Sequence, residues 1–227
     1  AGQYQRIVGT ADGTLNLSLG AGGQVQSMGL ELGLGDGSLL IAGYDGAVGI
    51  DAMEMKAGLS SNVLALERFD VVLANGAAMQ FDGSLDLAND WTPQTLSLSM
   101  ASKQMQRDLF HALWPRWLQP ATRQWVADQI PSGVVQDATL SLTAELDGAE
   151  PQIKMLTGSL AMANAEITLT GAAPAMTNVY GKLSLETDMA TIVLNQANIA
   201  DLALQYGRVT IPSPVAGTMP QAEVKMA

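Results

Sequence analysis

The chain has 227 residues, of which 48% are hydrophobic and only 5% aromatic, so aliphatic side chains and methionine must do most of the packing. This length is enough for one large β domain or two smaller ones, each with a buried core. The formal net charge of −11 argues against binding to nucleic acid or to an anionic membrane surface. The absence of cysteine excludes disulfides and thiolate zinc sites.

A short sequence motif recurs along the chain. It consists of a glycine, a small or polar residue, a leucine, any residue and an apolar residue. It occurs at residues 13–17, 37–41, 83–87, 158–162 and 181–185. We interpret each copy as a glycine turn that opens a strand with period-two alternation. The dipeptides Asp45-Gly46 and Asp82-Gly83 are typical of tight turns between strands.

Other segments alternate in the same way, at residues 96–100, 140–146 and 167–169. Each has apolar residues on one face and serine, threonine or glutamate on the other. The sequence therefore predicts a mainly β fold, a curled antiparallel meander sheet with one apolar face and one polar face. Residues 1–101 form the predicted N-terminal antiparallel β region.

A helical insert is predicted at residues 102–131, where the alternation stops. Apolar residues recur there at four-residue spacing, at Met105, Leu109, Leu113 and Trp117. Pro115 is expected to end or kink a first helix near residue 111 or 112. Pro120 fits the first turn of a second helix that runs to about residue 130. Two short helices are therefore expected to cover part of the sheet.

The strand pattern resumes after the insert, and residues 132–211 form the predicted C-terminal antiparallel β region. Residues 212–227 contain three prolines and are expected to be an extended tail. The two β regions are expected either as separate halves or as one continuous sheet. Because both chain ends look cut from a longer β pattern, we expect a region of a larger protein. The sequence has no run of eighteen apolar residues, so no membrane-spanning helix is predicted.

The residues needed for common catalytic sites are missing. His111 is the only histidine, so neither a histidine triad nor a histidine zinc site is expected. The acidic residues fall mainly in predicted turns and on polar strand faces, where local hydrogen bonding explains them. The glycine-rich residues 20–23 have no following lysine and are read as a turn. We therefore predict no enzyme activity, no cofactor and no metal.

Four of the eleven cationic residues gather in and around the predicted helices, at Lys103, Arg107, Arg116 and Arg123. The simpler interpretation is a solvated helix face. The alternative is contact with an anionic lipid head group or partner, for which Arg107 and Arg116 are the candidates.

Three of the four tryptophans lie in the same insert, at Trp114, Trp117 and Trp125. Large aromatic side chains usually seal a helix onto its neighbours, so we predict a helical cap over the sheet. Lining a ligand path is a second role that is compatible with the first.

The insert and the strands after it carry a family resemblance. The segments are Leu113-Trp114-Pro115, then residues 121–126 (ATRQWV) and residues 133–142 (GVVQDATLSL). Downstream come residues 165–167, 173–179, 181–183 and 207–211 in the same order as in the family. Over about residues 105–211 the chain resembles the YhdP-type members of the AsmA-like family.

This resemblance implies a large Gram-negative envelope protein that is anchored in the inner membrane. Its periplasmic β region would form a long curled sheet with an apolar groove, and would move phospholipids between inner and outer membranes in outer-membrane biogenesis. The predicted partner is therefore a phospholipid or another acyl-chain lipid, with no nucleic acid. Leucines of the later strands are the candidate groove lining: Leu140, Leu142, Leu160, Leu183 and Leu185.

Two other functions fit the same sequence. A closed structural β module would bind another envelope protein through its helices or edge strands. A hydrolase of envelope polysaccharide would use a pair of carboxylates without histidine.

Overall fold

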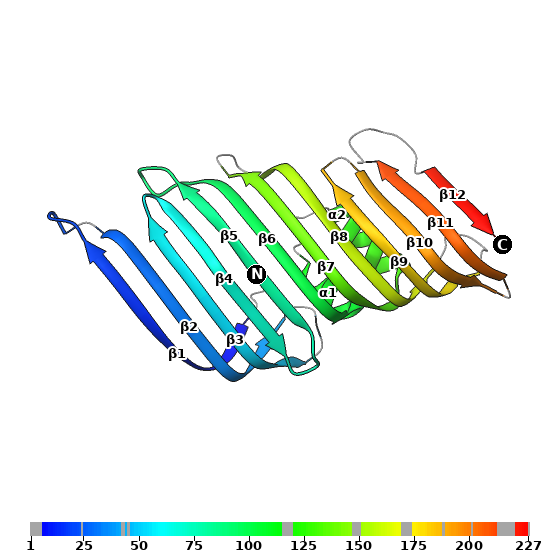
Figure 1. Cartoon of the computed structure of the whole chain (residues 1–227), viewed down its shortest axis with the longest axis horizontal. Coiled ribbons are helices and arrows are strands. Elements are labelled where there is room, and N and C mark those ends of the chain that lie inside the picture. Colours follow the sequence, from blue (N-terminus) through cyan, green and yellow to red (C-terminus); the bar gives the residue numbers. More distant parts are fainter. Residues whose placement is uncertain are drawn as a thin grey trace. The chain divides into compact units, whose positions relative to one another are not determined.

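The computed structural model describes residues 6–23, 25–41, 44, 46–114, 120–146, 151–168, 174–187, 189–200, 202–212 and 221–226. These residues form a mainly β structure with two short helices. The strands are antiparallel and hydrogen-bonded in their order along the chain, and the sheet of described strands is not closed into a barrel (Figure 1). The predicted fold class, a β meander with a two-helix insert, is confirmed.

Twelve strands and two helices make up the described part of the chain. The strands before the helices are β1 (Arg6–Leu19), β2 (Val25–Leu40), β3 (Ala47–Ser60), β4 (Val63–Leu73), β5 (Ala78–Leu87) and β6 (Pro93–Gln106). The helices are α1 (Arg107–Leu113) and α2 (Pro120–Gln129). The strands after them are β7 (Ser132–Glu145), β8 (Gln152–Ile167), β9 (Met176–Glu186), β10 (Met189–Ile199), β11 (Leu202–Pro212) and β12 (Gln221–Met226).

The chain divides into two compact units. Unit 1 comprises Ala1–Ser102 and Thr139–Leu156, and unit 2 comprises Lys103–Ala138 and Thr157–Ala227. The long strands β6, β7 and β8 each run through both units. The units therefore differ from the regions predicted from the sequence. Those regions were bounded where strands give way to helices, whereas the boundaries between the units fall within β6, β7 and β8.

Unit 1 is an amphipathic sheet whose apolar side chains line up in rows across neighbouring strands. One row joins Leu15, Leu30, Ala57 and Leu66, and the next joins Leu17, Met28, Leu59, Leu64 and Leu85. Cross-strand partners point to the same face, so both rows lie on one face of the sheet. The other face carries charged residues, including the ion pair between Lys56 and Glu67 at 3.3 Å.

The apolar face of unit 1 is closed at one end of the strands and open at the other. At the closed end the cross-strand partners Leu34, Met53 and Val71 are buried, as are Ile50 and Leu73. At the other end the two rows of leucines are half-buried or exposed. Because all described elements of unit 1 are strands of one sheet, unit 1 provides no second layer over these rows.

The recurring glycines lie inside strands and do not form turns, contrary to the prediction. Gly13 lies within β1, Gly83 within β5 and Gly181 within β9. Each sits where a neighbouring strand leaves no room for a side chain: a Cβ atom on Gly181 would be 2.6 Å from the carbonyl oxygen of Val193. Glycine at these positions allows the backbones of neighbouring strands to approach closely. In the sequence, such a glycine before an alternating segment looks the same as a glycine in a turn. The predicted turn at Asp82-Gly83 is therefore wrong as well.

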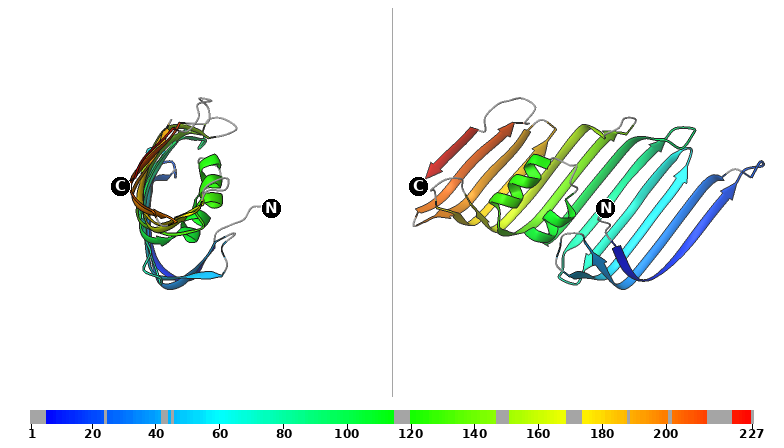
Figure 2. Two further views of the ribbon diagram at one scale, coloured as in Figure 1. Left: turned by 90° about the vertical axis from the view of Figure 1, so that its right-hand side faces the viewer. Right: turned by 180° about the vertical axis from the view of Figure 1, so that it is seen from behind.

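In unit 2, α1 and α2 lie against one face of curved strands (Figure 2). Two asparagines mark where these strands bend, because Asn164 in β8 has φ 50° and Asn178 in β9 has φ 49°. Both coincide with register shifts between β8 and β9. Such bulges bend a strand and increase its twist, and asparagine tolerates the left-handed region better than most residues. The hydroxyl of Tyr180 donates to Asn164 Oδ1 at 2.5 Å and ties the two bulges together.

The prolines of the insert act as expected, while the tail differs from its prediction. The second helix begins at Pro120, as predicted, and the first ends at Leu113, one or two residues later than predicted. Within the predicted extended tail, β12 pairs with β11 in an antiparallel ladder. The three prolines at 212, 214 and 220 precede β12, so they do not interrupt its pairing.

Candidate functional site

The predicted helical stripe is only partly present in the helix pair of unit 2. Leu109 of α1 is buried and Leu113 is half-buried, whereas Met105 belongs to strand β6. The helices begin at Arg107 and not at residue 102, because β6 continues to Gln106. Met105 and Leu109 are 2% and 0% exposed, and Trp114 is buried at the end of α1. The rings of Phe110 and Trp114 meet edge to face, with centroids 5.6 Å apart. From α2, Val126 is buried against the same layer. Burial of these side chains holds two helices that are too short to be stable alone.

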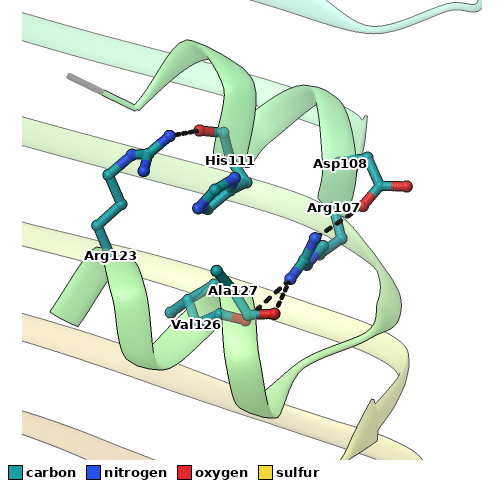
Figure 3. A network of polar contacts seen from close by, with 6 residues as sticks. All are labelled: Arg107, Asp108, His111, Arg123, Val126 and Ala127. Atoms are coloured by element: carbon teal, nitrogen blue, oxygen red, sulfur yellow. Dashed lines mark hydrogen bonds and ion pairs between the residues drawn. The ribbon is translucent and has the colours of Figure 1, made fainter. Parts of the chain in front are cut away.

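Arg107 joins the start of α1 to the end of α2 (Figure 3). Its Nη2 donates to the carbonyl oxygen of Val126 at 3.1 Å and to that of Ala127 at 2.7 Å. Its Nη1 donates to Asp108 Oδ1 at 2.8 Å. The side chain is only 16% exposed, so these bonds are partly shielded from water. Carbonyls in the last turn of a helix have few backbone donors, and the guanidinium supplies one to Ala127 and a second one to Val126, which also accepts from the N–H of Ile130.

Arg123 makes the reciprocal connection from α2 to α1. Its Nε donates to the carbonyl oxygen of Trp114 at 3.2 Å and its Nη2 to that of His111 at 3.3 Å. Each helix therefore presents its carbonyl end to an arginine of the other helix (Figure 3). At the end of α2, Thr168 also donates its backbone N–H to the carbonyl of Gln129 at 2.7 Å.

His111 lies between these two arginines, as Figure 3 shows. Burial lowers the pKa of His111, and the positive charges of Arg123 and Arg107 lower it further. Its Nε2 atom is buried without a hydrogen-bond partner among the described residues. Burial and the two neighbouring positive charges thus favour the neutral imidazole of His111 more than in a free histidine.

A small cavity of about 30 Å³ lies between the helices and the sheet of unit 2. Apolar side chains make up most of its wall: Phe110, Trp114, Trp125, Val126, Ile130, Val134, Val135, Leu160, Met162, Leu183 and Ile192. This volume is enough for about two water molecules, but a site lined in this way has few polar partners for them. Between the helices and the residues of β7, β8, β9 and β10 that line this cavity, little space is therefore left.

Two of the predicted cap residues, Trp114 and Trp125, line this cavity from the helices. Trp117 and the candidate head-group residue Arg116 lie outside the described residues. Arg107, the other head-group candidate, donates to the carbonyls of α2. The described part of the predicted cap thus serves to attach α1 and α2 to each other and to the sheet.

The predicted groove leucines have different environments. Leu160 and Leu183 are cross-strand partners in unit 2, and both line the cavity beneath the helices, with exposures of 7% and 6%. Leu185 is half-buried and pairs with residues of β8 and β10. In unit 1, Leu142 is 2% exposed and Leu140 is half-buried. At least three of the five are thus core residues.

The most accessible apolar surface was not among the predicted lining residues. On the open end of unit 1, Leu15 and Leu17 of β1 are 63% and 54% exposed, and Leu64 of β4 is 38% exposed. We use the term open apolar face for the two rows of unit 1 that contain Leu15 and Leu17. The alternation of residues 13–19 was visible in the sequence, but it does not show which strands would be left uncovered.

The described residues contain no cluster of three or more His, Asp or Glu side chains that would hold a metal ion. On the polar face of unit 1, several acidic residues are engaged in exposed ion pairs, such as Glu54 with Arg68 at 3.4 Å. Among the described helices, none is long and apolar enough to cross a membrane.

Comparison with known proteins finds no matching family model, no matching curated protein and no matching solved structure. The resemblance to the AsmA-like family thus stays a prediction from the sequence.

Proposed function

We propose that this chain is a lipid-holding segment of a periplasmic AsmA-like protein, whose open apolar face carries phospholipid acyl chains between the inner and outer membranes. The observation that carries the proposal is the exposure of leucines in continuous rows on a sheet face. Leu15, Leu17 and Leu64 remain 63%, 54% and 38% exposed. Contiguous exposed apolar surface of this kind marks a binding surface for lipid or protein.

The size of the face suits an acyl chain. A row across β1–β5 spans four interstrand spacings, or about 19 Å at roughly 4.8 Å each. One leaflet of a bilayer has a hydrocarbon thickness of about 15 Å, half of the roughly 30 Å core. An acyl chain lying along a row would therefore touch an apolar side chain on every strand that it crosses.

The energetics favour a continuous apolar surface over passage through water. Exposing an acyl chain costs about 0.8 kcal/mol per methylene, or on the order of 12 kcal/mol for roughly sixteen carbons. A face made of repeated leucines divides this barrier into small steps from one strand to the next. Binding of this kind requires no catalytic residue or cofactor, so we propose a lipid-binding protein and not an enzyme.

The resemblance of residues 105–211 to the AsmA-like family supports the envelope location and an inner-membrane anchor for the full-length protein. The charge distribution supports an aqueous compartment for the other face of unit 1. There, Lys56 also pairs with Glu31 at 3.5 Å, and both side chains are more than half exposed.

A closed structural β module that binds an envelope protein is the second candidate. It is favoured by unit 2, where α1 and α2 cover the apolar face and leave a cavity of only about 30 Å³. The two functions differ in what they require of the open apolar face of unit 1. Only the first requires that lipid occupy it.

Native mass spectrometry of the purified protein, with identification of solvent-extracted lipids, tests the proposal. The informative variant is Leu64→Asp combined with Leu66→Asp, which places two charges on the open apolar face. The matched control is Val63→Asp combined with Ala65→Asp, which places two charges on the opposite face of the same strand. We expect near-stoichiometric lipid on the wild-type and control proteins and its loss from the double variant.

Circular dichroism must show that the double variant stays folded for the comparison to count. Wild-type protein without lipid, or equal lipid on the double variant and the control, would refute the proposal. Stoichiometric recovery of a single envelope protein by lipid-free wild-type protein would support the second candidate.

A further inference from the structure

An exposed tryptophan lies at the open end of unit 1. Trp91 is 54% exposed and belongs to the turn at residues 88–92 between β5 and β6. Leu85, which continues the row of Leu17 and Leu64, lies on the strand that leads into this turn. The turn is at the same end of the strands as the β1–β2 and β3–β4 turns (Figure 1). The indole of Trp91 is therefore exposed at the end of the strands where the open apolar face lies.

Hydrogen bonds hold the backbone of this turn in place. The N–H of Trp91 donates to the carbonyl oxygen of Ala88 at 2.9 Å, and the N–H of Ala88 donates to that of Thr92 at 2.9 Å. Trp91 has φ 67°, in the left-handed region that glycine adopts most easily. Asn62 Nδ2 donates to Asn89 Oδ1 at 3.2 Å and connects the turn to the β3–β4 turn. The position of Trp91 at the open end is therefore fixed by both neighbouring turns.

The charged residues near this turn are acidic. Residues 15–30, 57–66 and 84–100, which make up this end of β1–β6, contain no lysine or arginine. They contain two carboxylates, Asp86 and Asp90, and both are exposed. Hydrogen bonds from the hydroxyl and the N–H of Thr92 lower the pKa of Asp90, so its carboxylate is charged at neutral pH. A negative charge therefore lies directly beside the exposed indole.

The four cations of unit 1 do not compensate this charge. Lys56, Arg68 and Lys154 are each paired with a carboxylate. Arg6 is at the opposite end of β1 from Leu17. An anionic head group above the leucine rows would therefore meet carboxylates without a free cation from the described part of unit 1. A head group that carries a positive charge would be attracted to the same place.

We propose that the turn at residues 88–92 recognises the ammonium group of a phospholipid whose acyl chain lies on the open apolar face. The face of the Trp91 indole attracts an ammonium group, and the carboxylate of Asp90 adds an opposite charge. An ethanolamine phospholipid carries such a group and has no net charge, so it avoids the repulsion that an anionic phospholipid would meet. The inference rests on the proposed lipid function and adds the class of head group to it.

Competition between two head groups on the same acyl chains tests the proposal. Delipidated protein is incubated with vesicles that contain equal amounts of dioleoyl phosphatidylethanolamine and dioleoyl phosphatidylglycerol, and bound lipids are counted by native mass spectrometry. We expect the ethanolamine lipid to be bound in about fivefold excess. In a parallel arm, N-acetyl phosphatidylethanolamine replaces the ethanolamine lipid. It keeps the acyl chains but has no ammonium group, so the preference should disappear.

Two variants locate the recognition site. Asp90→Asn keeps an oxygen that can accept from Thr92 but removes the charge, and Trp91→Leu keeps an apolar side chain but removes the aromatic face. We expect each to reduce the preference to about twofold or less, with the total amount of bound lipid unchanged. The matched control is Asp82→Asn, which removes the same charge from the polar face of β5 and should keep the full preference.

The amount of lipid and the ratio of lipids report on different proposals. A preference for the ethanolamine lipid that both variants reduce and the control retains would support ammonium recognition. Equal binding of the two lipids, a preference for phosphatidylglycerol, or an unchanged preference in Trp91→Leu would overturn it and leave the proposed lipid function intact. Binding of neither lipid would overturn the proposed lipid function as well.

Discussion

Replacing Arg107 with methionine should loosen the helix pair of unit 2 while the sheet stays intact. Methionine keeps an apolar stem of similar length but removes the guanidinium that bonds to Val126 and Ala127. The carbonyl of Val126 keeps the N–H of Ile130 at 3.1 Å as a second donor. The bond to Ala127, at 2.7 Å, is therefore the main loss.

The magnitude follows from the number and the kind of bonds. A hydrogen bond to a charged group contributes about 1.5–3 kcal/mol, and the second, partly replaced bond adds less. The local opening free energy of α2 should fall by about 2–4 kcal/mol, which corresponds to a roughly 30- to 700-fold faster amide exchange. Hydrogen exchange with mass spectrometry resolves this change in peptides that cover α2.

The controls separate loss of the guanidinium bonds from loss of charge. Lys103→Met removes an exposed cation nearby and should leave exchange of α2 unchanged. Arg107→Lys keeps the charge but cannot bond to two carbonyls in the same geometry, so its effect should be intermediate. If α2 in folded Arg107→Met exchanges as slowly as in the wild-type protein, the assigned role of Arg107 is refuted.

Three further predictions concern stability. Leu183→Asp buries a carboxylate in the cavity wall and should lower the free energy of unfolding by more than about 4 kcal/mol in denaturant titrations, whereas Lys182→Asp at an exposed neighbouring position should have a much smaller effect. The pKa of His111 is lower in the folded protein than in the unfolded protein, so as the pH falls the unfolded protein binds the proton first. The contribution of neutral His111 to the free energy of unfolding is therefore complete above the unfolded pKa of about 6.5 and is lost as the pH falls below it. His111→Gln should reduce that acid sensitivity relative to wild type, and equal pH profiles would contradict this. Gly181→Ala should destabilise by about 1–3 kcal/mol because a carbonyl oxygen of β10 lies 2.6 Å from the new Cβ, whereas Gly33→Ala, with nothing within 4 Å, should change stability by less than about 1 kcal/mol.

Local sequence was sufficient to predict several of the strands and the start of the second helix. Period-two alternation and the fixed φ of Pro120 are properties of a few neighbouring residues, so they can be read without knowledge of the fold. The within-strand glycines were misread as turns because a close approach between strands depends on a residue far away in sequence. For Gly181 that residue is Val193.

Coverage of the sheet was not predictable from the same patterns. Leu15 and Leu183 occur in two copies of the same motif, each two residues after a glycine within a strand, yet they are 63% and 6% exposed. The difference comes from the helices, which lie over the face that contains Leu183, and from the position of Leu15 on β1, which pairs with β2 alone among the described strands. A period-two pattern shows which side chains share a face, but whether another layer covers that face is a tertiary property.

This difference decides which substitutions can test lipid binding. Leu183 is part of the packing between the helices and the sheet, so a charge there destabilises unit 2 whether or not lipid ever binds it. Loss of lipid from such a variant would have two explanations. Leu64 is already 38% exposed in the folded chain, so a charge there costs little folding stability and acts mainly on whatever occupies the face. Because Val63→Asp with Ala65→Asp adds the same two charges to the other face of β4, a difference in bound lipid between the two double variants points to the open apolar face itself.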